Sequence, residues 1–288
     1  MLVLGNDVTG NTGSSQAPVI TNGKNNDYDG ISLVPSGKLT VVSHVDGLGN
    51  NGTAADGSLE TNASIVELGG TLEVQSGIQI TDEKLTISGS GTDNQGALYS
   101  DGQTGTGTRF GSSNSGDEST VFLDGNASIG VGIAGNQLLV GSIQGTGNLT
   151  KVGPGILAID KASTFAGNMT IAEGHVTARG VADNALDTSG IVFLYGSMDI
   201  NSRTDDNGLT AKIGTLFGPG TIGASNASTN EHSELTIDVE SSLGFFIGEI
   251  EDNLDLIKEG FGTQVLAGNN TYTGITTVNA GILQVDGS

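Results

Sequence analysis

The chain lacks several residue types on which other classes of protein depend. Its 288 residues include no cysteine and no tryptophan, and aromatic residues make up only 4% of it. Without cysteine there can be no disulfide framework. No segment approaches the roughly 18 to 20 consecutive apolar residues that a transmembrane helix needs. The sequence therefore predicts no membrane insertion by a helix of this chain.

Basic residues are also scarce. Ten lysines and arginines stand against 32 aspartates and glutamates, which gives a formal net charge of −22 at pH 7. A charge of this size keeps a protein soluble and repels both nucleic acid and anionic lipid surfaces. We therefore expect no nucleic-acid partner and no insertion into a membrane.

Glycine and short apolar runs are what the chain has in abundance. Glycine accounts for 48 of the 288 residues, and hydrophobic residues make up 35%. The apolar residues form short β-branched or leucine-containing runs that alternate with polar residues and end at Gly or Asn, a pattern typical of strands joined by tight turns. Disordered low-complexity sequence does not show such regular runs. The pattern predicts an all-β protein with a long, thin core.

One segment of the chain is repeated near its end. An offset of about 107 positions pairs Lys151 with Lys258 and Gly153 with Gly260, and it continues through Leu149/Leu256, Gly155/Gly262, Thr164/Thr271, Phe165/Tyr272, Gly167/Gly274, Thr170/Thr277 and Gly174/Gly281. A single offset that holds at many positions indicates an internal repeat. Each short strand can bury only one face, so we expect the copies to be stable only when coils stack upon one another.

The repeated residues resemble a known family. The copies at 141–178 and 248–285, of which NNTYTGITTVNAGIL (269–283) is the clearest part, are similar to the autotransporter-associated β-strand repeat. That repeat belongs to passenger domains of bacterial type V secretion proteins. Phe165 departs from the family pattern, which usually has tyrosine there. The resemblance covers about a quarter of the chain and implies a fold and a secretion route, but no ligand.

The resemblance and the strand pattern together predict the fold. We expect an all-β, right-handed parallel β-helix (β-solenoid) with protruding loops, formed by 1–288 as a single passenger fragment without a translocator barrel. Residues 1–30 are expected to form an N-terminal cap. Gly69-Gly70 separates two predicted strands, 64–68 and 71–75, and is consistent with a hairpin or a corner. In a β-helix we expect the corner.

The longest tract that resembles a loop runs from 89 to 119. It is rich in Gly, Ser, Asn and Asp, and long loops of this kind often carry function. Its bulky or charged residues are the candidate partner-binding residues Tyr99, Asp101, Arg109 and Phe110. An extended coil with polar strands is an alternative interpretation of the same tract.

One acidic cluster has the spacing of a calcium loop. Asn25, Asp27 and Asp29 precede a glycine at alternate positions, but Ser36 stands where such a loop needs a bidentate glutamate. The tract at 205–208 is a weaker match. Because a simple Asp-Gly turn accounts for both tracts, we predict no bound metal and no cofactor.

Residues suited to catalysis are dispersed. His44, His175 and His232 lie far apart in the sequence, and there is no nucleophile motif of the Gly-x-Ser-x-Gly type. Glu67 and Glu73, on neighbouring predicted strands, could approach each other, although a solvated surface pair is the simpler interpretation. We therefore predict no catalytic residues and no enzyme activity.

Three functional interpretations follow from the resemblance. The leading one is a secreted or surface-displayed adhesin or virulence factor that binds host-cell surface proteins, matrix or glycans. The second is a diffusible effector that binds one specific host receptor, and the third is a β-helix enzyme that cleaves polysaccharides. Passengers could also associate with one another, and because the net charge opposes this, salt should promote it. The expected location is extracellular or at the bacterial outer-membrane surface.

Overall fold

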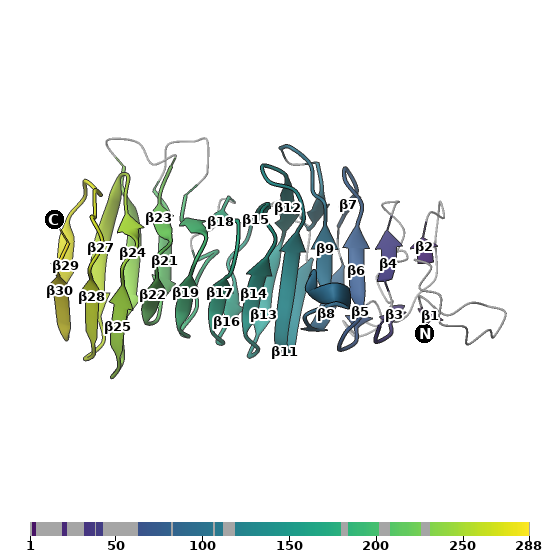
Figure 1. The fold of residues 1–288 in the computed structure, drawn as a ribbon, viewed down its shortest axis with the longest axis horizontal. Helices are drawn as coiled ribbons and strands as arrows, with labels where there is room; N and C mark the ends of the chain where they lie inside the picture. Colours follow the sequence, from purple (N-terminus) through teal and green to yellow (C-terminus); the bar gives the residue numbers. More distant parts are fainter. Residues whose placement is uncertain are drawn as a thin grey trace, which may run out of the picture.

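The computed structural model describes residues 2–3, 19–21, 32–37, 39–42, 63–81, 83–105, 107–111, 119–179, 184–201, 208–225 and 231–287, and the structural statements below refer to these residues. In them the chain winds into a parallel β-solenoid whose coils stack along one axis, with the two termini at opposite ends of the rod (Figure 1). The predicted β-solenoid is confirmed. No described helix is long and apolar enough to cross a membrane.

The strands are short, and most have two to six residues. In chain order they are β1 (Leu2–Val3), β2 (Val19–Thr21), β3 (Ser32–Val34), β4 (Leu39–Val42), β5 (Ala63–Val66), β6 (Thr71–Val74), β7 (Gln79–Ile80), β8 (Lys84–Gly89), β9 (Leu98–Ser100), β10 (Arg109–Phe110), β11 (Thr120–Val131), β12 (Gln137–Val140), β13 (Ser142–Gly145), β14 (Leu149–Val152), β15 (Ile156–Ile159), β16 (Thr164–Phe165), β17 (Met169–Ile171), β18 (His175–Ala178), β19 (Val192–Leu194), β20 (Ser197–Asp199), β21 (Thr210–Ile213), β22 (Leu216–Gly218), β23 (Thr221–Gly223), β24 (Ser233–Asp238), β25 (Leu243–Phe246), β26 (Glu249–Ile250), β27 (Leu254–Glu259), β28 (Thr263–Leu266), β29 (Thr276–Val278) and β30 (Ile282–Val285). A 3₁₀ turn, η1, spans Thr92–Asn94.

Each strand pairs with the corresponding strand of the coils before and after it, so the sheets run along the rod. An 8-stranded sheet contains β7, β10, β12, β15, β18, β20, β23 and β26, one strand from each of the successive coils. The other strands form an 18-stranded and a 4-stranded sheet. Two parallel neighbouring strands have to be joined by a crossover connection. Here the other strands and corners of each coil form that connection.

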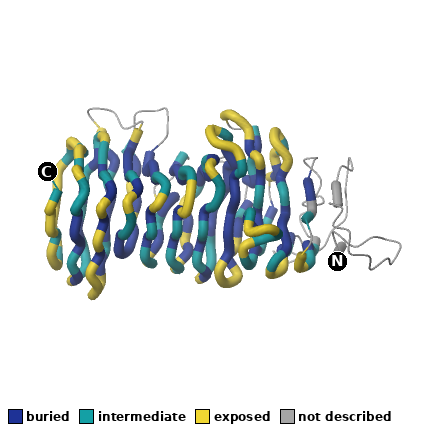
Figure 2. Tube along the Cα trace, in the orientation of Figure 1, coloured by how far each residue is buried: buried dark blue, intermediate teal, exposed yellow. Residues whose placement is uncertain are grey.

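The core lies along the axis of the rod. In β8, β11 and β13 the residues Leu85, Val121 and Ile143 occupy the same row and are fully buried. Their neighbours in each strand point outward, as the alternation of side chains in a strand requires. Burial of each such side chain stabilises the fold by about 1.5 to 3 kcal/mol. Buried positions accordingly follow the interior of the coils along the rod, whereas the last coil, with β29 and β30, has no buried residue (Figure 2).

The joint at Gly69-Gly70 is a corner and not a hairpin, as expected. β5 pairs with β3 and β8, whereas β6 pairs with β4 and β9, so the two strands on either side of the joint belong to different rows. The pairing partners come from adjacent coils. This local arrangement therefore continues the solenoid.

The tract from 89 to 119 differs from the predicted loop. It contains η1, β9 and β10, and both strands pair with neighbouring coils. Leu98 in β9 and Phe110 in β10 are fully buried in the core. The alternative interpretation, a coil with strands, is thus the correct one for these residues, although their inward side chains include the apolar Leu98 and Phe110 beside the polar Ser100.

Little of the expected N-terminal cap lies among the described residues. Within 1–30 they are β1 and β2, which pair with β3 and β4 and extend the rows of strands. A capping role for this segment stays a prediction.

The two copies of the repeat occupy different faces of the rod. β14 in the first copy belongs to the 18-stranded sheet, whereas its counterpart β27 belongs to the 4-stranded sheet. Likewise β15 lies in the 8-stranded sheet and its counterpart β28 lies in the 18-stranded one. The repeat therefore defines a succession of strands and corners, and does not fix the face on which they lie.

Glycines of successive coils form a column at one corner. The column contains Gly125, Gly147, Gly167, Gly190 and Gly214, and a methyl group on any of the last four would overlap the carbonyl oxygen of the glycine before it. Gly167 needs no positive φ, so close approach alone excludes a larger residue there. Gly125 has a φ of 81° but open space around its Cβ position.

This column gives a matched test of coil stacking. Gly167→Ala should lower the free energy of unfolding by about 1 to 3 kcal/mol, because the backbones of two coils must separate. Gly125→Ala should lower the free energy of unfolding by about 1 kcal/mol, only because alanine is strained in the left-handed backbone conformation. Urea unfolding midpoints followed by circular dichroism would compare them. A midpoint for Gly167→Ala equal to that of the unsubstituted protein would contradict the stacking argument.

Candidate ligand-binding groove

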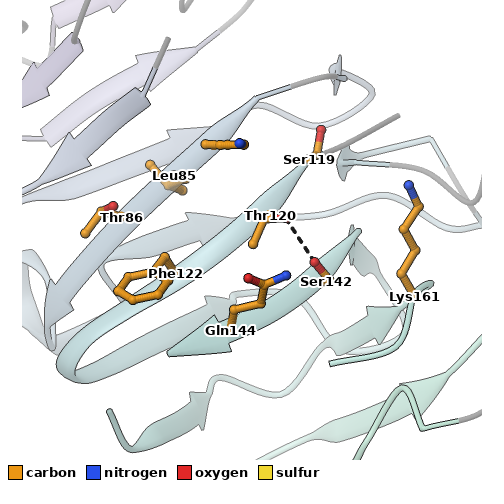
Figure 3. A pocket seen from close by; sticks show the side chains of 9 residues that line it. Leu85, Thr86, Ser119, Thr120, Phe122, Ser142, Gln144 and Lys161 are labelled. Carbon is orange, nitrogen blue, oxygen red and sulfur yellow. Dashed lines mark hydrogen bonds between the residues drawn. The ribbon is translucent and has the colours of Figure 1, made fainter. Parts of the chain in front are cut away.

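A groove on the outer face of the solenoid is the best-formed concave site among the described residues. It has a volume of about 480 Å³, within the usual range for small-molecule sites. Figure 3 shows the side chains that line it. They are Lys84, Leu85, Thr86, Ser119, Thr120, Phe122, Ser142, Gln144 and Lys161.

Strand register brings these residues together from three coils. Lys84 in β8 is the partner of Thr120 in β11, which is the partner of Ser142 in β13. The next outward row, two residues further along each strand, contains Thr86, Phe122 and Gln144. The groove is thus the outer surface of the same strands whose inward residues form the core.

The lining combines hydroxyl groups with one aromatic ring. The hydroxyls of Thr120 and Ser142 form a hydrogen bond of 3.1 Å, drawn as a dashed line in Figure 3. Phe122 is 45% exposed, and its ring lies beside Gln144 in the same view. An exposed ring beside hydroxyl and amide groups can bind a ligand that has both an apolar face and polar edges.

The described lining of the groove includes two lysines, although the chain is strongly acidic. None of the nine lining residues that the structure describes is acidic, whereas the whole chain has 32 acidic and ten basic residues. Lys84 lies on β8, and Lys161 follows β15 beyond Ser142 (Figure 3).

Sequence reasoning did not single out the groove. Its residues come from segments that are about 20 to 40 positions apart, and only the register between coils makes them neighbours. One signal was present in VFLDG at 121–125: Phe122 stands between Val121 and Leu123, which are buried, so alternation places the phenylalanine on the outer face.

The predicted partner-binding residues divide between surface and core. Tyr99 in β9 donates a hydrogen bond of 2.6 Å to the exposed carboxylate of Asp101. Burial and this hydrogen bond raise the pKa of the Tyr99 hydroxyl. Arg109 is half-buried in β10, whereas Phe110 is fully buried. Phe110 is therefore a core residue that no partner can contact, and partner binding by the other three stays a prediction.

Glu67 and Glu73, the two carboxylates that could approach each other, have different neighbours. Glu67 accepts a hydrogen bond from the Ser36 backbone N–H at 3.2 Å. Glu73 is the strand partner of Tyr99, and burial together with the nearby Asp101 raises the pKa of its carboxyl group. The two glutamates therefore have different interaction partners.

No cluster of potential metal ligands occurs in the part of the chain that the structure describes. No three His, Cys, Asp or Glu side chains gather there. His175 contacts Ser197, and His232 contacts the Asp255 carboxylate at 2.8 Å. His44, the calcium-like tract at 25–29 and most of 205–208 lie outside the described residues.

Two lysines are fully buried at equivalent positions of the repeat. The Lys151 ammonium donates hydrogen bonds to the carbonyl oxygens of Val152, Gly153 and Glu173 at 2.9, 2.6 and 3.3 Å. Glu173 belongs to the next coil, so the side chain joins two corners. Burial lowers the pKa of Lys151 to about 8.

The second copy repeats this arrangement. Lys258 donates to the carbonyl oxygens of Glu259, Gly260 and Ala280, which correspond to the three acceptors of the first copy at the offset of 107. Burial also lowers the pKa of Lys258. An amine with a lowered pKa can act as a nucleophile. These two are enclosed and held by carbonyl groups, so their role is structural.

Comparisons with known proteins agree with this architecture. A family model described as the passenger-associated transport repeat matches residues 149–178 and 256–285, the two segments that begin just before the buried lysines. The chain is 28% identical over 275 residues to the adhesin BmaC autotransporter of Brucella suis biovar 1 (strain 1330). That match covers 91% of this chain and spans 6% of the relative. No solved structure matches significantly.

These findings define the class of protein. The chain is a β-solenoid that carries two passenger-associated transport repeats, and it is similar over most of its length to an autotransporter adhesin. The resemblance inferred from the repeated residues is thereby confirmed.

The buried lysines predict a pH dependence of stability. In the unfolded chain Lys151 has its ordinary pKa of 10.5, and in the folded chain about 8. Between these values the unfolded state binds more protons, so the free energy of unfolding should rise with pH. The gain from Lys151 should reach up to about 3 kcal/mol and be absent from Lys151→Met.

Urea unfolding at pH 7 and pH 10 would measure this difference. Lys161→Met, which removes one half-buried positive charge, is the matched control and should keep the pH-dependent gain. Equal gains in Lys151→Met and the unsubstituted protein would refute the assignment.

Proposed function

We propose that this chain is part of an autotransporter passenger that is displayed at the bacterial surface or released from it, and that it acts as an adhesin for host-cell surface proteins, matrix or glycans. The observation that supports this best is the similarity to an autotransporter adhesin over 91% of the chain. That relative is named as an adhesin, and the present chain spans 6% of it.

The structure suits such a role physically. Stacked coils make a rod whose length grows with each coil, and the core needs no ligand to be complete. The outer face is therefore available for contacts with other molecules. The charge of −22 keeps a protein of this shape soluble outside the cell.

A diffusible effector is the second candidate, and one observation favours it. The groove lined by Lys84 and Lys161 lies at one place among the described coils, on β8, β11 and β13 and the segment after β15. A confined site fits one defined ligand, whereas an adhesin that binds through its whole face needs no such site. Binding experiments with local variants separate the two.

Binding to cells tests the proposed function directly. We expect fluorescent beads coated with purified 1–288 to bind cultured mammalian cells or immobilised matrix protein in a saturable manner. An unrelated protein of similar negative charge on the same beads controls for non-specific contact. Binding no greater than that of this control would contradict the adhesin proposal.

The same assay tests the surface residues of β9 and β10. Tyr99→Ala, Asp101→Asn and Arg109→Gln change outward groups and should leave the β-sheet circular dichroism unchanged. If these residues contact the partner, the triple variant should bind at least about tenfold more weakly, which corresponds to 1.4 kcal/mol. Replacing the whole tract is unsuitable, because it would remove the core residues Leu98 and Phe110. Unchanged binding by the triple variant would exclude a role for these three residues.

A further inference from the structure

We propose that the outer face of β19, β22 and β25, which we call the phenylalanine face, binds the same face of a second copy of the chain. This inference goes beyond the proposed function, because adhesion to host molecules does not require contact between copies. Three observations carry it: an aromatic row that crosses three coils, a strand that is apolar on both sides, and an absence of charge in a strongly acidic chain.

Three phenylalanines occupy one outward row of this face. Strand register pairs Phe193 in β19 with Phe217 in β22, and Phe217 with Phe245 in β25, and the three strands follow one another along the rod (Figure 1). The rings of Phe193 and Phe217 stack with their centroids 5.6 Å apart. Such stacking stabilises the sheet itself. Phe245, at the end of the row, is 47% exposed, so the row ends in a ring that faces solvent.

β25 is apolar on both of its sides. Phe246 is fully buried in the core, whereas Leu243, Phe245 and Ile247, at alternate positions, are 60%, 47% and 54% exposed. Tyr195, which follows β19, is also exposed. Strands that are apolar on both sides are typical of sheets whose two faces are both covered. The composition of β25 therefore fits a strand whose outer face packs against another surface.

The phenylalanine face differs from the surroundings of the other exposed phenylalanine, Phe122. The neighbours of Phe122 in its row are the polar residues Thr86 and Gln144. Single exposed apolar residues are normal on protein surfaces, whereas contiguous apolar patches mark interaction sites. The row of Phe193, Phe217 and Phe245 belongs to the second kind.

The phenylalanine face carries no charge. The segments 188–198, 213–224 and 241–248 contain its three strands with the corners at both ends, and they include no Asp, Glu, Lys, Arg or His. All of these residues are described. The whole chain has a net charge of −22, so two copies repel each other wherever acidic surfaces meet. An uncharged face is where two copies can approach most closely.

A second copy matches this face in chemistry. In a twofold contact the same patch lies on both sides, so apolar rows meet apolar rows and no like charges are opposed within the patch. Outward side chains of two sheets can interdigitate in such packing. A partner recognised by ion pairs needs charged residues, and a saccharide is held by hydroxyl or amide groups. The outward positions of the three strands are instead Phe193, Phe217, Leu243 and Phe245.

The size of the face predicts a weak contact. Three strands span about 15 Å across the sheet, and five residues span about 16 Å along a strand, so two copies would bury about 500 Å² in total. Stable interfaces bury roughly 1,200 Å² or more. We therefore expect association only at high protein concentration, or where many copies are displayed side by side.

Sedimentation equilibrium at rising protein concentration tests the proposal. We expect purified 1–288 to be monomeric when dilute and to form dimers as its concentration approaches about 1 mM. Added salt should strengthen the association, because it screens the repulsion between the acidic chains. A monomeric mass at every concentration in high salt would overturn the proposal. Association that salt weakens would indicate ion pairs between copies, and would overturn it too.

A variant of β25 locates the contact. Leu243→Ser/Phe245→Ser/Ile247→Ser, the β25 triple variant, removes three exposed apolar side chains and leaves the core residue Phe246 in place. The dimer Kd should rise at least about tenfold. Unchanged β-sheet circular dichroism would show that the variant is folded.

The chain offers a matched control with the same three residue types. The control is Leu68→Ser/Phe122→Ser/Ile133→Ser, whose side chains are 68%, 45% and 48% exposed. Its dimer Kd should equal that of the unsubstituted protein. An equal loss of association in both triple variants would show non-specific apolar contact. Unchanged association in both would place the contact elsewhere, for example at β29 and β30 of the last coil, which also expose apolar side chains. Either result would overturn the proposal.

The bead assay separates a second copy from a host molecule on the phenylalanine face. If 1–288 stays monomeric while beads coated with the β25 triple variant no longer bind cells, the face binds a host partner, and the self-association proposal fails while the adhesin proposal stands. If dimers form through the face but beads do not bind cells or matrix, self-association stands and the adhesin proposal fails.

Discussion

Parallel pairing between successive coils is the constraint on which the rest of this structure depends. A strand of two to six residues buries too little apolar surface to be stable alone, so each coil must be held by the coils before and after it. The pairing fixes which side chain points inward and which outward at every position. It also forces the corners to stack closely, which explains why glycines such as Gly147 and Gly167 form a column where no side chain fits.

The buried lysines show a second way of holding the corners together. A charged group in the core costs free energy unless its hydrogen bonds are satisfied. Lys151 and Lys258 meet that condition by donating to carbonyl oxygens of their own corner and of the next coil. Carbonyl groups at tight corners lack strand partners, so the ammonium group satisfies several at once. The lysine of the repeat is therefore a link between coils.

The same strand register also determines which side chains lie on the outer face of the rod. Outward rows have no packing requirement, so their composition can vary from coil to coil without loss of the core. At β8, β11 and β13 those rows gather two lysines, several hydroxyl groups and Phe122 into one groove. Neighbouring coils carry other surfaces, such as the ion pairs of Lys212 with Asp238 and Glu259. A solenoid can thus present different sites along one rod while its interior stays uniform.

The sequence by itself determined the all-β class, the stacked coils, the corner at Gly69-Gly70 and the family of the repeat. Alternation and glycine positions are local patterns, and the offset between Lys151 and Lys258 can be found by comparing the sequence with itself. It did not determine that Phe110 lies in the core, that the two copies of the repeat occupy different faces, or that Lys84, Phe122 and Lys161 line one groove. These properties depend on the number of residues in each intervening coil. Coil lengths vary, so only the register of the folded chain decides which outward residues become neighbours.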